Sequence, residues 1–152
     1  MEKISGQIRD ILAGYAPQLE LVDEERFALK PRPDKWSAKE ILGHLVDSAQ
    51  NNLRRFIVAQ YDENPLIVYQ QDEWVKISNY QHYPTHELIQ LWTLLNLHIC
   101  RVLENAKGAA SQKLCNTNDS ISHSIEWLAK DYIKHMLHHL HQILLMEPIT
   151  YP

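Results

Sequence analysis

The sequence predicts an all-α protein, a four-helix bundle with a long crossover between its second and third helices. Four long segments show helical periodicity, strand-like alternation is scarce, and the chain contains only four glycines in 152 residues. A bundle of this kind buries one apolar stripe of each helix against its neighbours. The length suits a single helical-bundle domain, 1–152, that is large enough to bury a proper core.

Two helices are expected in the first part of the chain. The first covers about residues 4–28, and Pro17 inside it predicts a break or a kink, because proline lacks a backbone N–H. The second follows Ser37, a good N-cap, and Glu40 completes a capping box with it. This second helix is expected to continue to about Tyr61.

Two further helices are expected in the second part of the chain. The third covers about residues 85–106, with Thr85 as its N-cap. The fourth starts near Ser120 or Ser122 and ends at about Met146, shortly before a proline.

The crossover between the second and third helices covers residues 62–84. Within it, Asp72-Glu73-Trp74-Val75 favours a short helix. A long ordered loop in a compact domain is more often functional than idle. The aromatic side chains of this loop could cap a pocket, or could equally fill a core or an interface; they are Tyr69, Trp74, Tyr80 and Tyr83.

Composition and charge exclude several classes of function. A formal net charge of −4, with no basic cluster beyond Arg54-Arg55, argues against nucleic-acid binding. The chain has no run of about 18 or more apolar residues, which argues against a membrane span. The N-terminal residues lack the apolar core of a secretory signal, and Cys100 and Cys115 lack zinc-type spacing. Reduced thiols in a cytoplasmic protein are therefore expected.

The predicted fourth helix is rich in histidine, since four of the nine histidines of the chain lie between residues 135 and 141. His135 and His139 are four residues apart, so they stack on one helical face, at the edge of the apolar stripe. Two imidazoles at this spacing can bind one divalent metal ion. Helical phase places His138 and His141 towards solvent, where they are expected to be ordinary surface histidines.

A polar line runs along the second helix, beside its apolar stripe. An imidazole, a hydroxyl, an amide and a guanidinium follow one another at helical spacing; they belong to His44, Ser48, Asn51 and Arg55. The edge of an apolar stripe is normally aliphatic, or charged and solvated. The line therefore predicts one wall of a polar pocket with a metal at its end, and His44 is the best candidate for a third ligand.

Two motifs resemble those of the DinB/YfiT-like family. Residues 36–48 follow the pattern W-S-x-x-E-x-x-x-H-L-x-D-S, which is similar to the opening of that family's second helix. His135-x-x-x-His139-x-x-Gln142-Ile143 resembles its closing motif, and the resemblance covers nearly the whole chain. Asp72-Glu73-Trp74 and the pair His98 and Arg101 are similar to weaker features of the YfiT-like branch, although the pair is one residue further apart here.

The resemblance implies a four-helix bundle in which three histidines bind a divalent metal ion, nickel or zinc. Carried over to this sequence, those ligands are His44, His135 and His139. The polar positions that follow the family's first histidine correspond to Ser48, Asn51 and Arg55. The family implies metal-dependent hydrolysis, and a related branch transfers low-molecular-weight thiols: bacillithiol, mycothiol or glutathione.

Three neutral imidazoles leave a metal ion with open coordination positions, as catalytic sites require. A water there has its pKa lowered towards neutrality, and a thiol there loses its proton. The expected activity is therefore hydrolysis of a small-molecule substrate, or thiol transfer to one. Arg55 could hold an anionic group, and Asp47 or Asn51 could orient water or a ligand imidazole. Helical phase directs Asp47 away from the core stripe, which weakens it as a general base.

Several alternatives stay open at this point. His98, at the edge of the apolar face of the third helix, could be a fourth ligand, a group that supports a ligand, or a satisfied core histidine. The whole pocket could belong to a non-catalytic bundle that binds a metal or a ligand, or the chain could be a structural bundle that acts through protein partners. The resemblance and the aromatic-rich crossover suggest a homodimer.

Overall fold

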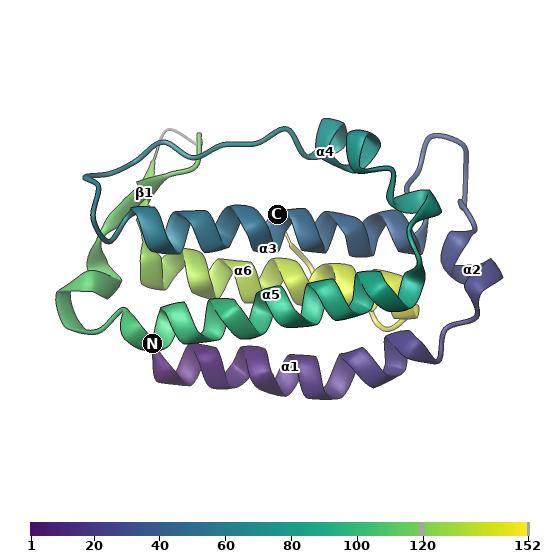
Figure 1. The fold of residues 1–152 in the computed structure, drawn as a ribbon, viewed down its shortest axis with the longest axis horizontal. Coiled ribbons are helices and arrows are strands. Elements are labelled where there is room, and N and C mark those ends of the chain that lie inside the picture. The colour runs from purple at the N-terminus through teal and green to yellow at the C-terminus, as the bar shows by residue number, and fades with distance from the viewer. Residues whose placement is uncertain (119–120, 152) are drawn as a thin grey trace.

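The computed structural model describes residues 1–118 and 121–151, and its four long helices lie side by side as a bundle (Figure 1). These helices are α1 (Glu2–Glu20), α3 (Ala38–Val58), α5 (Thr85–Asn105) and α6 (Ile125–Leu144). Both α1 and α3 contact α5 and α6, so the four helices close a ring around one core. The sequence-based prediction of a four-helix bundle with a long crossover is confirmed.

The crossover lets α3 and α5 run in the same direction along the bundle, although they are consecutive long helices (Figure 1). It carries α4 (Gln71–Ser78), which confirms the predicted short helix, and the 3-10 turn η1 (Tyr80–His82). Both elements pack on α3, and each buries one large side chain, Val75 and Tyr80. Because the crossover covers the outer face of α3, this helix is buried on both sides.

The break in the first predicted helix occurs later than expected. Pro17 lies within α1, in its last turn, and the helix continues to Glu20. Only one backbone hydrogen bond is lost at a proline in this position, and the buried Leu19 holds the turn against the core. The chain then starts α2 (Glu24–Ala28), because the Asp23 side chain accepts hydrogen bonds from two backbone N–H groups of its first turn.

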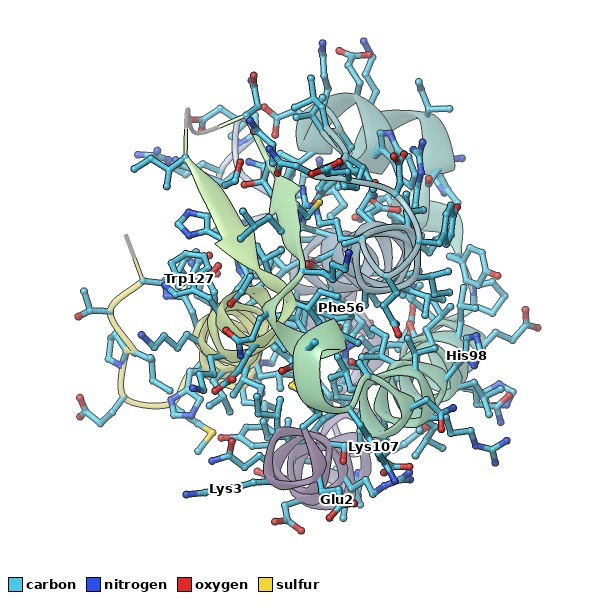
Figure 2. All side chains as sticks on the ribbon, turned by 90° about the vertical axis from the view of Figure 1, so that its left-hand side faces the viewer. Glu2, Lys3, Phe56, His98, Lys107 and Trp127 are labelled. Carbon is cyan, nitrogen blue, oxygen red and sulfur yellow. The ribbon has the colours of Figure 1, made fainter. Side chains whose placement is uncertain are left out.

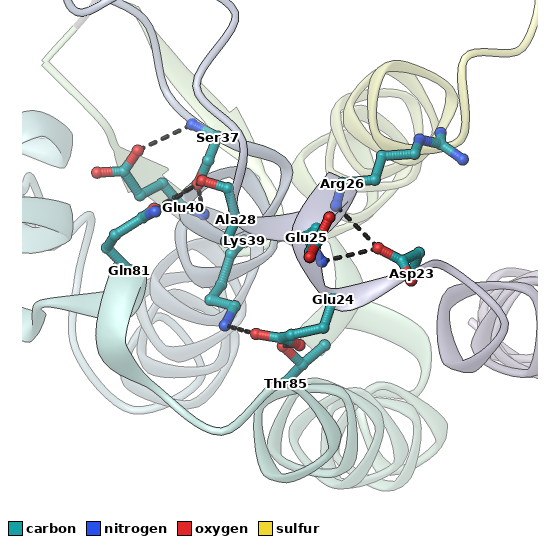
Figure 3. Close-up of polar contacts among 10 residues, drawn as sticks. All are labelled: Asp23, Glu24, Glu25, Arg26, Ala28, Ser37, Lys39, Glu40, Gln81 and Thr85. Carbon is teal, nitrogen blue, oxygen red and sulfur yellow. Dashed lines mark hydrogen bonds and ion pairs between the residues drawn. The ribbon is translucent and has the colours of Figure 1, made fainter.

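The start of α3 follows the sequence-based prediction, whereas the start of α5 does not. Ser37 and Glu40 form the expected capping box on α3. The N-cap of α5 is Pro84, whose side chain makes no capping hydrogen bond. Thr85 instead donates its hydroxyl to Glu24 Oε2 at 2.5 Å, and Glu24 Oε1 pairs with the buried Lys39 (Figure 3). Glu24 therefore joins α2 to the first turns of both α3 and α5.

A small hairpin precedes α6. Strands β1 (Leu114–Asn116) and β2 (Ser122–Ser124) pair antiparallel, after the 3-10 turn η2 (Gly108–Gln112). Ser122 is thus part of a strand, and Ser120, the other predicted start of the helix, lies outside the described residues. The N-cap of α6 is Ser124, whose hydroxyl oxygen accepts from the backbone N–H of Trp127 at 3.1 Å.

The core lies between the four long helices and includes the fully buried Trp92, Phe56 and Met136. One buried polar pair crosses it, as the Tyr132 hydroxyl donates to Asn96 Oδ1 at 2.6 Å. In the described part of the chain, no helix combines the length and the apolar character that a membrane crossing needs.

Gly43 allows the Tyr80 ring to lie directly against the backbone of α3. A Cβ at this position would collide with the ring and would lie 2.8 Å from the Tyr80 Cβ. We expect Gly43→Ala to lower the free energy of unfolding by about 1–3 kcal/mol, because η1 must move away from α3. Urea unfolding measures this, with Gly14→Ala on α1 as control. Apart from the neighbouring backbone of α1, no atom of the described residues lies within 4 Å of a Cβ at Gly14, so its gain in helix propensity should appear undiminished. An equal gain in the free energy of unfolding in both variants would contradict the close packing of the Tyr80 ring against Gly43.

Candidate metal centre

Three imidazoles meet between α3 and α6, one from His44 and two from His135 and His139. Each residue offers a nitrogen, and these nitrogens all lie within 4.8 Å of one another. His44 Nε2 and His135 Nε2 are 3.0 Å apart. Two nitrogens that each lie about 2.0–2.1 Å from one ion, at tetrahedral or octahedral angles, are separated by about 3 Å. The donor set therefore fits a single divalent metal ion.

Helix geometry and packing place the three rings. His135 and His139 are one turn apart on α6, and their ring centroids are 4.6 Å apart. α3 packs against α6 and presents His44, which is 1% exposed, to both of them at ring-centroid distances of 5.0 Å. The Trp36 ring, just before the capping box of α3, lies 5.2 Å from the His44 ring and limits its movement.

Two of the three imidazoles have a partner that orients the ring. His139 Nδ1 lies 2.7 Å from Gln142 Oε1. An amide oxygen only accepts, so Nδ1 carries the hydrogen and Nε2 keeps its lone pair for a metal. His135 Nδ1 lies 3.4 Å from Ser48 Oγ, a longer contact in which the hydroxyl can donate or accept. Gln142 was not predicted as a site residue, although it belongs to the quoted closing motif.

The third imidazole has an unpaired buried group next to it on α3. Among the described residues, His44 Nδ1 and Asp47 Oδ2 are buried without a hydrogen-bond partner, and they belong to residues one helical turn apart. Asp47 Oδ1 accepts from the Tyr80 hydroxyl at 2.6 Å. Asp47 points away from the apolar stripe of α3, as predicted. The crossover covers this face of the helix, so the side chain is only 1% exposed.

Burial keeps the imidazoles neutral near pH 7, the form that binds metals. Burial, and to a lesser extent the neighbouring His139, lower the pKa of His44 to about 4. Burial, followed by His139 and His44, lowers the pKa of His135 to about 2. Burial also lowers the pKa of His139. The opposite effect holds for the carboxyl group, since burial raises the pKa of Asp47 to about 6.

A cavity lies on each side of the histidine cluster. The first, of about 550 Å³, reaches His135 and is otherwise lined mainly by polar and aromatic side chains, among them Ser48, Asn52, Arg55, Tyr69 and Tyr151. The second, of about 490 Å³, reaches His139 and is lined by Lys35, Trp36 and Gln142, among others. Gln71, at the start of α4, lines both cavities.

The predicted polar line lies only partly along the first cavity. Ser48 and Arg55 line it, whereas Asn51 donates its amide to the Asp47 backbone oxygen at 2.9 Å. Asn52, which was not predicted, lines the cavity in its place. Arg55 donates from Nε and Nη2 to the Ile67 backbone oxygen, at 3.2 and 3.0 Å, so it also holds the start of the crossover.

Three further histidines lie elsewhere than the sequence suggested. His98 is exposed on the outer side of α5 (Figure 2), so the structure does not bring it to the cluster and it is not a core histidine. His138 and His141 were expected to be ordinary surface histidines, and this prediction is wrong. They are half-buried, because their Nδ1 atoms donate to the backbone oxygens of Ile149 and Glu147, each at 2.6 Å.

The sequence matches the model of the DinB superfamily over residues 7–143. Curated relatives include a "putative metal-dependent hydrolase" from Halalkalibacterium halodurans. It is 27% identical over 123 residues, which are 80% of this chain and 71% of the relative. A protein of the same description from Oceanobacillus iheyensis is 27% identical over the same shares of the two chains.

Solved structures share the fold at low sequence identity. YfiT from Bacillus subtilis, described as "a probable metal-dependent hydrolase with an unusual four-helix bundle topology", has a TM-score of 0.83. Its identity is 19%, over 93% of this chain and 82% of YfiT. A mutant of a mycothiol-dependent maleylpyruvate isomerase has a TM-score of 0.78 and 15% identity, over 97% of this chain and 61% of the isomerase.

Proposed function

Because this chain belongs to the DinB superfamily, we propose that it is an enzyme that acts on a small molecule through one divalent metal ion, nickel or zinc. His44, His135 and His139 would hold the ion. The observation that carries the proposal is the convergence of three neutral imidazoles from α3 and α6 within 4.8 Å. The names of the curated relatives support metal-dependent chemistry.

The residues around the cluster prepare it for this role. The bound ion would supply Lewis acidity, which lowers the pKa of a water or a thiol that it binds. Gln142 orients the His139 imidazole, and Ser48 contacts that of His135. We assign Asp47 an orienting role for His44, because its Oδ2 and the His44 Nδ1 are both buried without a partner and a small side-chain movement could join them. The Trp36 ring packs beside the His44 ring and lines the cavity that reaches His139.

Hydrolysis is the first candidate reaction, since it is the activity for which the curated relatives are named. Thiol transfer is the second candidate, and the two cavities favour it. One cavity ends at His135 and the other at His139, so two ligands can approach the cluster from different sides. The likeness to a mycothiol-dependent isomerase is in keeping with this arrangement.

Metal content and turnover of the untagged protein test the proposal. We expect about one nickel or zinc ion per chain by elemental analysis. Turnover is then sought on a panel of esters and amides, and on a panel of low-molecular-weight thiols with electrophiles. Activity on the first panel identifies a hydrolase, and activity on the second a thiol transferase. Stoichiometric metal without turnover on either panel favours a non-catalytic binding bundle, and a protein that also refuses added nickel and zinc overturns the metal site.

A further inference from the structure

The chain turns back after α6 and runs along the helix that carries two of the three clustered histidines (Figure 1). We call residues 145–151 the return segment. Leu145 adopts the left-handed conformation, with φ of 55°, and so ends the helix with a sharp change of direction. The backbone N–H of Met146 then donates to the His141 oxygen at 3.0 Å.

His138 and His141 hold the return segment in place. Their Nδ1 atoms donate to the Ile149 and Glu147 backbone oxygens at 2.6 Å. His141 is itself fixed to α1, since its Nε2 lies 2.8 Å from the Tyr15 hydroxyl. The four histidines of α6 therefore fall into two pairs. His135 and His139 belong to the metal cluster, whereas His138 and His141 anchor the return segment.

Tyr151 is the residue that this anchoring brings to the cluster. Its ring centroid lies 5.2 Å from that of His135, at an interplanar angle of 65°. Its hydroxyl donates to Asp131 Oδ2 at 2.7 Å. The hydroxyl thus ties the ring to α6, and the Ile149 oxygen, two residues earlier, ties the backbone to His138. The ring cannot move away from His135 without breaking its bond to Asp131.

Tyr151 also lines the cavity that leads to His135, opposite side chains of α3 and the crossover such as Ser48 and Tyr69. We infer that Tyr151 is a specificity-determining residue, whose ring limits the size of the ligand that can reach the metal ion through this cavity. The inference rests on the proposed metal site. It adds a residue that neither the sequence motifs nor the polar line of α3 indicated.

Ligand binding to the cobalt-loaded protein tests this inference without any enzymatic assay. Imidazole and the larger 4-phenylimidazole are titrated into the Co²⁺ protein, and binding is followed by the d–d absorption bands. We expect the wild type to bind 4-phenylimidazole about 5- to 150-fold more weakly than imidazole, because an overpacked ligand costs about 1–3 kcal/mol. Tyr151→Ala should remove most of this difference. Tyr151→Phe keeps the ring but loses its bond to Asp131, so it should keep more of the difference than Tyr151→Ala.

Two further variants complete the design. Tyr61→Ala is the matched control, since Tyr61 is 75% exposed and belongs to neither cavity; it should behave as the wild type. Tyr151→Trp should weaken imidazole binding as well, and it tests the inference even if Tyr151→Ala unfolds. The same ratio of the two affinities in the wild type and in Tyr151→Ala overturns the inference alone, as does unchanged imidazole binding in Tyr151→Trp if Tyr151→Ala unfolds. A wild type that binds neither Co²⁺ nor added nickel or zinc overturns the metal site, and the inference with it.

Discussion

Replacing His44 by alanine is expected to abolish stoichiometric binding of nickel and zinc. His135 and His139 remain one turn apart on α6, but two imidazoles hold a divalent ion far less tightly than three. Loss of a group that merely supports a ligand costs about 10–100-fold in affinity, so loss of a ligand should cost more than about 100-fold. Isothermal titration calorimetry and elemental analysis of the purified variant measure the effect.

His98→Ala is the matched control for His44→Ala, because His98 is exposed on α5 and lies outside the cluster. It should retain the metal affinity of the wild type. His44 is almost fully buried, so His44→Gln, which preserves most of the volume, separates loss of a ligand from loss of packing. Full metal occupancy in a folded His44→Ala protein would show that the three-histidine site is wrong.

Replacing Asp47 by asparagine is expected to stabilise the metal-free protein at pH 8 while weakening its metal site. Burial raises the pKa of Asp47 to about 6 in the folded state, above its value of about 4 in an unfolded chain. The folded state therefore binds more protons between pH 4 and pH 6, and this residue makes the protein more stable as the pH falls through that window. Above pH 6 the buried carboxylate costs up to about 3 kcal/mol.

Asparagine removes that cost and keeps an oxygen that can accept from Tyr80. The gain in the free energy of unfolding should be greatest at pH 8 and small at pH 4, which urea unfolding of the metal-free proteins measures. Nickel or zinc affinity should fall by about 10–100-fold if Asp47 orients His44. Asp10→Asn, at an exposed position of α1, is the control and should change neither quantity. A stability gain without loss of affinity would remove Asp47 from the metal site.

Local signals predicted the helices and the direction of several side chains. The capping box at Ser37 marks the start of α3 because both of its hydrogen bonds form within four residues. The spacing of His135 and His139 is an equally local signal, because residues four apart in a helix lie on the same face. Local signals failed where a residue had a competing partner: Thr85 binds Glu24 instead of capping α5, and Ser122 pairs in β2 instead of starting α6.

By itself, the sequence determined the four helices, the crossover and the candidate ligands, since these depend on periodicity and short-range spacing. Only the tertiary structure decided which of these groups meet. The 3.0 Å approach of His44 to His135 joins residues 91 positions apart, and the Tyr80 bond to Asp47 spans 33. The two outer histidines of α6 likewise acquire their role only when residues 145–151 fold back onto them. Helical phase describes one helix at a time, whereas burial and contact depend on what packs against it.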